Sequence, residues 1–572
     1  MDSNARVNIG IQRFDKLIEQ NKFYIDKTGF IREWWETGSD VSLITRPRRF
    51  GKTLNMSMLE CFFSNEYAGR SDLFEGLSIW SDSPSGKSEK YRQLQGTFPV
   101  IFISFAGVKA GNVKEMKAAV KHLLTEIYGK YKNLMKSEVF DDNDRDHFGS
   151  VNKEMDDVTA YMSIKSLCSY LHKVYEKEVI VILDEYDTPM QEAWLNGYWE
   201  EAVGFFRSFF DNTFKTNPQL YRGIITGITR ISKESIFSDL NNLDVITTTS
   251  DEYATAFGFT EEEVFQALDD AGMGAEKQEV KRWYNGFTFG SHTDIYNPWS
   301  ITSFIAKKGK YEAYWANTSG NGLVNSLIQQ GNSEIKQTME ELLQGMSFVT
   351  ELDEQIVFNQ LDGDEDAVWS LLLATGYLKV LNLERVGILK KKVYTLTLTN
   401  METMWMFENM VKGWFKGSTK TAYNEFIKAM LSDNVRMMNA FMNKVALKTF
   451  SYFDSGNKPS EEIEPERFYH GFVLGMVVNL ADIYKVCSNR ESGYGRYDVM
   501  LKPIDRSGKA FIFEFKVLNP YEDEKTLEDT LANARAQIEE KQYETELLSE
   551  GFSPKQIRKY GFVFRGKTCL IG

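Results

Sequence analysis

Apolar and polar positions follow one pattern in the first part of the chain and another beyond it. In the first part, short apolar runs are separated by long stretches with helical periodicity. Such runs are typical of strands buried on both faces, so we expect an α/β fold with a parallel sheet covered by helices on both sides. The runs lie at Val41–Thr45, Val100–Phe105, Val179–Leu183, Gly223–Thr226 and Val245–Thr249.

The pattern becomes mainly helical near Thr260. Thr260 and Glu263 have the spacing of a capping box in front of an apolar helical face. Further on, Ala367–Asn400 reads as one helix followed by two strands. This arrangement is typical of a winged-helix module, and a plain connecting hairpin fits it equally well. We therefore predict three regions, at residues 1–258, 259–415 and 416–572.

The last region ends in a predicted hairpin. Tyr497–Leu501 and Ala510–Val517 read as its two strands, and residues 505–508 supply turn chemistry between them. Three phenylalanines alternate along the second strand. Because alternate side chains point to one face of a strand, we expect these rings to enter a core.

The opposite face of this hairpin carries two acids and a lysine. If the hairpin is symmetric about Arg506, Asp498 lies directly opposite Glu514, and Lys516 points to the same face. Two carboxylates so close repel each other unless a cation or a proton lies between them. We therefore expect Asp498 and Glu514 to bind a divalent metal, and Lys516 to orient a water or steady negative charge. A solvent-facing edge with an ordinary Glu–Lys pair is the alternative.

A second group of candidate residues follows the first apolar run. The segment TRPRRFGKTLN lies between a predicted strand and a predicted helix, as the phosphate-binding pattern GxxxxGK[ST] does, but Arg46 stands where the first glycine belongs. Backbone N–H groups at the helix start can hold phosphate oxygens, Lys52 would reach the terminal phosphates and Thr53 would bind Mg²⁺. Arg49 and Gly51 are further expected nucleotide contacts. The alternative is a basic turn that only caps a helix.

Acids at the end of the third apolar run support this interpretation. In an open α/β sheet the ligand chemistry lies at the carboxyl ends of the strands. We expect Asp184 to hold Mg²⁺ through water and Glu185 to polarise the attacking water. Thr226, at the end of the next run, is a candidate sensor of the γ-phosphate or an ordinary strand end. Arg230 is a candidate phosphate-sensing cation, although a surface arginine is the stronger interpretation.

Composition narrows the classes of partner. The chain of 572 residues has 67 basic and 81 acidic residues and a net charge of −14, so it does not attract polyanions through its overall field. Four scattered cysteines without CxxC spacing favour a reducing compartment and indicate no zinc site. We find no signal-peptide pattern and no apolar stretch long enough for a membrane span, so we expect a cytoplasmic protein without a membrane partner.

Taken together, these segments resemble two known families. The stretches IGIQRFDKLIEQNKFYIDKT, TRPRRFGKTLN, VIVILDEYDTPM and GIITGITRISKESIFSDLNNL are similar to the predicted AAA-ATPase-like family. The stretches ERFYHGFVLGMVVNL, SNRESGYGRYDVMLKP and FIFEFKV resemble the PD-(D/E)XK nuclease-like domain. The form RPRRFGKT is usual in the first family, so Arg46 departs only from the general motif.

The resemblance implies ATP and Mg²⁺ as cofactors. It also implies a P-loop NTPase fold, then a helical and winged-helix-like middle, then a restriction-endonuclease-like α/β domain. Nucleotide-binding, metal-binding or nuclease-type roles are carried over onto Lys52, Thr53, Asp184, Glu185, Asp498, Glu514 and Lys516.

Three other positions have weaker signals. Glu466 precedes the hairpin, where such folds often place a first acid, but an acid favoured by a helix N-terminus is the stronger interpretation. Gln537 lies on the following helix, where a side chain can return to the site. His470 stands among aromatic residues and is more typical of a core or boundary position than of a catalytic base.

The sequence leaves three functions open. The first, which the intact triplet of Asp498, Glu514 and Lys516 favours, is an ATP-binding and ATP-hydrolysing module coupled to a metal-dependent nuclease. The second is a nucleotide-dependent switch with a catalytically silent nuclease-like domain, which the acidic net charge mildly favours. The third is an ATPase with a mechanical output. DNA or RNA as the substrate, the direction of coupling and oligomerisation also stay open.

Overall fold

The structure is a computed structural model, and it divides into two compact units. One unit comprises Met1–Thr318 and Thr350–Glu402, and the other comprises Ser319–Val349 and Thr403–Gly572. The structure describes residues 10–81, 88–230, 236–237, 240–315, 322–352, 365–414, 418–453, 472, 475–476, 478–492, 495–518, 524–565 and 568–572. The chain is mixed α/β, as predicted. The boundaries of the three predicted regions stay a prediction.

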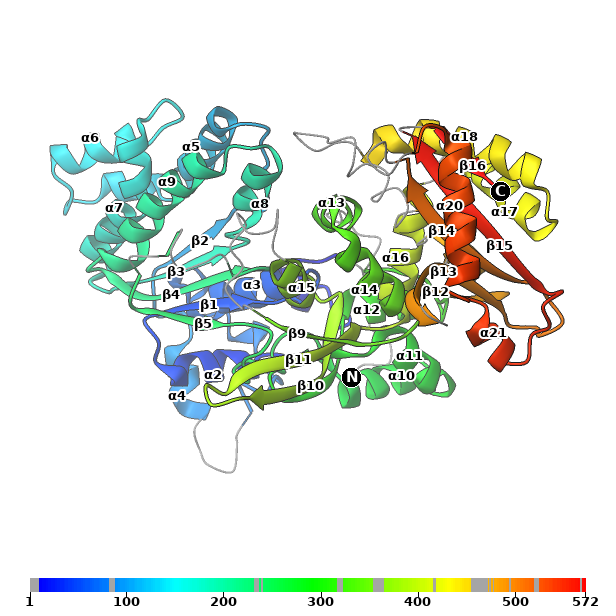
Figure 1. Cartoon of the computed structure of the whole chain (residues 1–572). Coiled ribbons are helices and arrows are strands. Elements are labelled where there is room, and N and C mark those ends of the chain that lie inside the picture. The colour runs from blue at the N-terminus through cyan, green and yellow to red at the C-terminus, as the bar shows by residue number, and fades with distance from the viewer. Residues whose placement is uncertain are drawn as a thin grey trace. The chain divides into compact units, whose positions relative to one another are not determined.

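The first unit contains the expected parallel sheet (Figure 1). Its five strands run in the order β2-β3-β4-β1-β5, and every neighbouring pair is parallel. Since β4 lies between β1 and β3, the carboxyl ends of these three strands meet at one edge. The strands are β1 (Val41–Thr45), β2 (Val100–Ser104), β3 (Val179–Asp184), β4 (Leu220–Gly227) and β5 (Leu243–Ile246).

Helices cover this sheet because their apolar stripes need burial. Helices α5, α7 and α9 pack on one another above the sheet in the view of Figure 1, and α2 lies below it. The described helices of this part are α1 (Phe14–Glu19), α2 (Gly29–Thr37), α3 (Lys52–Phe63), α4 (Ser88–Leu94), α5 (Val113–Lys130), α6 (Asp142–Ser150), α7 (Asp157–Tyr175), α8 (Thr188–Leu195) and α9 (Trp199–Phe210).

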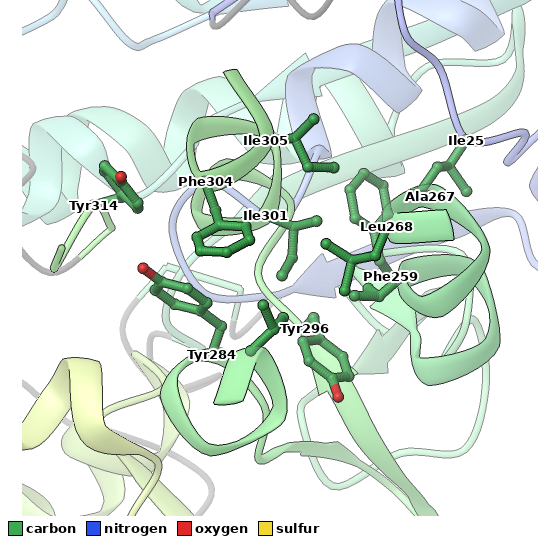
Figure 2. Close-up of a cluster of buried hydrophobic side chains, with 12 residues drawn as sticks. Ile25, Phe259, Ala267, Leu268, Tyr284, Tyr296, Ile301, Phe304, Ile305 and Tyr314 are labelled. Atoms are coloured by element: carbon green, nitrogen blue, oxygen red, sulfur yellow. The ribbon is translucent and has the colours of Figure 1, made fainter. Parts of the chain in front are cut away.

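The segment after the sheet forms its own buried cluster, shown in Figure 2. Its rings include Tyr284 and Phe304, and the partly buried Tyr311 packs against the cluster, with 4.8 Å between the ring centroids of Phe304 and Tyr311. The predicted capping box is confirmed, because the Thr260 N–H donates to Glu263 and the Glu263 N–H donates back. The elements are β6 (Phe259–Thr260), α10 (Glu261–Asp270), α11 (Lys277–Tyr284), β7 (Phe287–Phe289), β8 (His292–Tyr296) and α12 (Pro298–Ala306).

The expected helix followed by two strands is present in the first unit. Helix α15 (Glu365–Ala374) is followed by the antiparallel strands β10 (Leu378–Val386) and β11 (Lys391–Leu398). The other elements of the middle of the chain are α13 (Gly322–Gln330), α14 (Ser333–Leu343), β9 (Phe348–Glu351), α16 (Met401–Trp414), α17 (Ser418–Leu431) and α18 (Val435–Phe453).

The second unit carries a mixed sheet of five strands in the order β12-β13-β14-β15-β16. The β14–β15 pair is parallel and the other pairs are antiparallel. Helix α20 packs on β14 and β15 (Figure 1). The elements are β12 (Tyr484–Ser492), β13 (Gly495–Pro503), β14 (Ala510–Val517), α20 (Leu527–Glu540), α21 (Thr545–Ser549), β15 (Ile557–Arg565) and β16 (Thr568–Ile571).

The predicted hairpin is confirmed as β13 and β14. Strand β14 has the predicted bounds, and β13 extends beyond Tyr497–Leu501 at both ends. Two of its phenylalanines, Phe511 and Phe513, are fully buried, and Phe515 stacks on Phe562 with ring centroids 4.8 Å apart.

Candidate functional site

The phosphate loop forms without its first glycine. Arg46 continues from strand β1, and its N–H donates to the carbonyl of Gly227 on β4 at 3.1 Å. Its fully buried guanidinium donates to the carbonyls of Thr247 at 2.6 Å and Glu252 at 3.0 Å. Burial lowers the pKa of Arg46 to about 9. Arg46 therefore anchors the loop to neighbouring segments.

The left-handed backbone conformation that this loop needs occurs later, at Arg49 (φ 65°) and Gly51 (φ 81°). Gly51 is the N-cap of α3 and introduces the helix without steric cost. The Arg49 guanidinium lies over the ring of Trp299, 4.3 Å from its centroid. Helix α12 holds the loop at a second point, since Nδ2 of Asn297 donates to the carbonyl of Arg48 at 3.2 Å.

The structure brings the predicted nucleotide-site residues together at the sheet edge. Oγ1 of Thr53 donates to Asp184 at 2.7 Å, and Oγ1 of Thr226 donates to its other carboxylate oxygen at 2.5 Å. Nζ of Lys52 donates to the carbonyls of Arg46 and Pro47, at 2.8 Å each, so it lies inside the loop. Thr226, which the sequence left between a sensor and a strand end, thus contacts Asp184.

Charge is concentrated and desolvated at this edge. Burial lowers the pKa of Lys52 to about 8, and the nearby Glu185, Asp187 and Asp184 oppose that shift. Burial and the neighbouring Asp184 raise the pKa of Glu185. Glu185 also has a left-handed backbone (φ 55°), which is costly for a side chain of this type and clusters at functional sites.

Asp187 is not among the site residues predicted from the sequence, although it lies two residues beyond Glu185. Its Oδ2 accepts from the N–H groups of Ile228 and Thr229 at 3.0 and 2.9 Å. The residue is 1% exposed, and its Oδ1 is buried without a hydrogen-bond partner in the part of the chain that the structure describes. Asp187 thus fixes the segment after β4. The role of Arg230, half-buried in that segment, stays a prediction.

The second unit brings Asp498, Glu514 and Lys516 together. The ladder pairs Val499 with Phe513, and one further step in this register sets Asp498 opposite Glu514, as predicted. Asp498 accepts the N–H of Phe515 at 2.7 Å. Burial raises the pKa of both carboxyls, and the charge of Asp498 raises that of Glu514 further. The charge of the Lys516 ammonium opposes part of this rise in both pKa values, so it acts on both acids.

Gln537 returns to this site from α20. Its Nε2 donates to Oε1 of Glu514 and, at 3.0 Å, to the hydroxyl of Tyr543. Among the described residues, Oε2 of Glu514 is buried without a hydrogen-bond partner. A buried carboxylate oxygen of this kind, with the charge of a second carboxyl acting on it, is chemically suited to a hard divalent cation. The residues present therefore fit a Mg²⁺ or Mn²⁺ ion.

A third acidic ligand is not found in the described part of the chain, where no three His, Cys, Asp or Glu side chains are placed so that they could hold one metal ion together. The sequence candidates Glu466 and His470 lie outside the described residues. The four cysteines are buried and free.

Comparisons with known proteins match the two parts of the chain that carry these sites. A family model described as predicted AAA-ATPase matches residues 8–237, and a model of the PD-(D/E)XK nuclease superfamily matches residues 464–572. The chain is thus similar to an AAA-ATPase-like protein joined to a nuclease-like domain, which confirms the two families that the sequence resembled. The winged-helix-like middle stays a prediction.

One relative of this chain comes from Azotobacter chroococcum mcd 1. It is described as an uncharacterized protein in the vnfD 5' region and is 25% identical over 402 residues, which is 70% of this chain and 68% of the relative. Among the described helices, none combines the length and apolar character that a bilayer crossing requires.

Proposed function

We propose that this protein binds and hydrolyses ATP in its first unit and cleaves nucleic-acid phosphodiesters with a metal-dependent site in its second. The observation that carries the nuclease part is the paired arrangement of Asp498 and Glu514 with Lys516 on the same face. The ATPase part is supported by Thr53 and Thr226, which both donate to Asp184. The expected setting is the cytoplasm.

In the nucleotide site, each residue has a separate proposed task. Gly51, Lys52 and the amides at the start of α3 hold the phosphates. Thr53 and Asp184 would hold Mg²⁺ if it binds here. Glu185 would take the proton of the attacking water, because burial and Asp184 raise its pKa towards the pH at which the enzyme works. Arg49, now stacked on Trp299, is proposed to leave this ring for a phosphate.

In the nuclease-like site, Asp498 and Glu514 would hold the metal. A bound divalent ion lowers the pKa of water and neutralises developing negative charge. Lys516 contributes a second positive charge beside the two carboxyls. Gln537 fixes the orientation of Glu514 through Oε1 and so leaves Oε2 available.

A catalytically silent second unit is the alternative. It is favoured by the fact that only two acids gather at this site in the described part of the chain. In that case the nucleotide site would act as a switch, and the carboxyl pair would have no role in phosphodiester cleavage.

Cleavage of labelled nucleic acid decides between these functions. The full chain with Mg²⁺ or Mn²⁺ is expected to cut labelled DNA or RNA, and Lys516→Ala is expected to lower the rate by about 10²- to 10³-fold, as for loss of one charge-stabilising group. Lys502→Ala on the neighbouring strand β13, which removes a partner of Glu546, is the matched control and should cut normally. No cutting by any form, on either nucleic acid, would favour the switch.

A further inference from the structure

Helix α8 begins with an acid that holds another segment of the chain. Asp187 is the N-cap residue of α8, a position where an aspartate usually accepts from the amides of the first helical turn. Among the described hydrogen bonds its side chain makes no such cap. Its carboxylate instead accepts from the N–H groups of Ile228 and Thr229 and, at 2.9 Å, from the hydroxyl of Thr229. The start of α8 and the segment after β4 are therefore joined through this one carboxylate.

Gln191, one turn along α8, joins the same acid to the phosphate loop. Its Nε2 donates to Oδ2 of Asp187 at 3.0 Å, and its Oε1 accepts from Nη2 of Arg48 at 3.1 Å. An amide side chain can do both because it carries a donor and an acceptor. Arg48 follows Pro47, whose carbonyl accepts from Nζ of Lys52. Hydrogen bonds thus run from the phosphate loop through Gln191 and Asp187 to the segment after β4.

This segment is held from two further sides. The N–H of Arg46 donates to the carbonyl of Gly227, and the hydroxyl of Tyr186 donates to the carbonyl of Thr229 at 2.8 Å. The Tyr186 ring fills the space beside Gly227, where an added Cβ would clash with it. The phosphate loop, the turn after β3 and the segment after β4 therefore form a closed set of contacts. Glu185 lies in that turn, next to Tyr186.

We propose that Gln191 is a positioning residue of the nucleotide site, which fixes the phosphate loop relative to the turn that carries Glu185. A movement of the loop on binding phosphate would shift Arg48, and Gln191 would pass that shift to Asp187, two residues beyond the proposed base. The proposed phosphate and Mg²⁺ contacts are made by other residues, so loss of Gln191 affects hydrolysis more than binding. The inference rests on the proposed ATP hydrolysis and adds a residue that positions its site.

Gln191→Leu removes both hydrogen bonds with little change in size. Its kcat for ATP hydrolysis is expected to fall about 10- to 100-fold, as for a small misplacement at an active site, while its affinity for ATP stays within about threefold. The matched control is Gln266→Leu, because Gln266 is an exposed residue of α10 that donates to Asp270, four residues away, at 2.8 Å. The control should bind and hydrolyse ATP as the unchanged protein does.

A double-mutant cycle with Arg48→Met separates this role from mere stabilisation of α8. If Gln191 acts by joining Arg48 to Asp187, Gln191→Leu loses most of its effect on kcat once Arg48 is replaced. Losses that multiply in the double variant would overturn the proposal, and so would an unchanged kcat in Gln191→Leu. Gln191→Glu keeps the acceptor for Arg48 but repels Asp187, and as the second variant it should lose kcat in the same way.

Hydrogen exchange gives a readout that needs no turnover. In ATP-free protein, the amides of Ile228 and Thr229 are expected to exchange severalfold faster in Gln191→Leu than in Gln266→Leu, at a similar unfolding temperature. If the unchanged protein binds ATP without hydrolysing it, the proposed ATPase activity fails and this exchange alone decides. Faster exchange would then leave the link through Gln191 standing, and equally slow exchange in both variants would overturn it.

Discussion

At the residue scale, Arg46 shows what a motif can and cannot predict. The sequence identified the position where the loop departs from the general glycine pattern, and the pattern GKT predicted the start of α3. It could not predict where the Arg46 side chain lies, because its partners, Thr247 and Glu252, are some two hundred residues away. The contact of Thr226 with Asp184 depends equally on β4 lying between β1 and β3.

Lys52→Ala is expected to weaken ATP binding strongly. Hydrogen bonds to a charged group contribute about 1.5–3 kcal/mol, which corresponds to a roughly 10- to 150-fold loss of affinity, and the buried loop would also lose its internal cation. Fluorescent-nucleotide titration measures the loss. Lys90→Ala, which removes an exposed lysine on α4, is the control. Full affinity in Lys52→Ala would show that the nucleotide binds elsewhere.

Glu185→Gln is expected to spare ATP binding and slow hydrolysis by about 10²- to 10⁴-fold, the usual contribution of a positioned general base. The substitution keeps the shape of the side chain and removes the group that accepts the proton. Steady-state phosphate release and nucleotide affinity, measured on the same sample, separate the two effects. Unchanged turnover would remove Glu185 from the proposed role.

At the element scale, the alternation of apolar residues along a strand predicted the position of that strand, whereas the periodicity of a helix did not predict which residues the helix contacts. The apolar positions of β14 predicted its bounds, and the assumed symmetry of the hairpin about Arg506 predicted the register that pairs it with β13. The sequence did not predict that the N-terminus of α12 supports the phosphate loop, because no local pattern links Asn297 to Arg48. Gln537 was a weak prediction for the same reason, since its contact requires α20 to lie across β14.

Asn297→Ala tests this support. Oδ1 of Asn297 caps α12 by accepting from two backbone N–H groups, and its Nδ2 holds the carbonyl of Arg48. The variant is expected to lose about 1 kcal/mol of cap stability and, in addition, nucleotide affinity. Thermal unfolding and nucleotide titration measure the two losses.

Asn112→Ala is the matched control, because Asn112 caps α5 through the N–H of Glu115 and has no contact with the phosphate loop among its described hydrogen bonds. It should lose stability alone. If the two variants bind nucleotide equally well, the α12 contact does not support the site.

At the scale of the whole molecule, composition and pattern predicted a mixed α/β chain with a parallel sheet first and a strand-rich unit last. They did not predict that Ser319–Val349 joins the second unit while Thr350–Glu402 returns to the first. Such a division depends on contacts between segments far apart in sequence, which periodicity does not encode. Both proposed sites have one chemical requirement in common. Each places acids close together in a buried position, and a divalent cation would reduce the repulsion between their negative charges.

Calorimetric titration of Mg²⁺ or Mn²⁺ into the full chain tests this requirement most directly at the second site. Burial and Asp498 raise the pKa of Glu514. Its carboxyl therefore keeps a proton at pH values above about 4.3, the ordinary pKa of a glutamate side chain. Metal must displace that proton, and affinity therefore rises with pH until the raised pKa is passed.

Titrations in two buffers of different ionisation enthalpy count the released protons, in ATP-free protein that carries Asp184→Asn to remove the carboxylate proposed to hold metal at the first site. The account predicts proton release and metal binding by this protein, and neither after Glu514→Gln is added. Metal binding of equal affinity in both, without proton release, would contradict it.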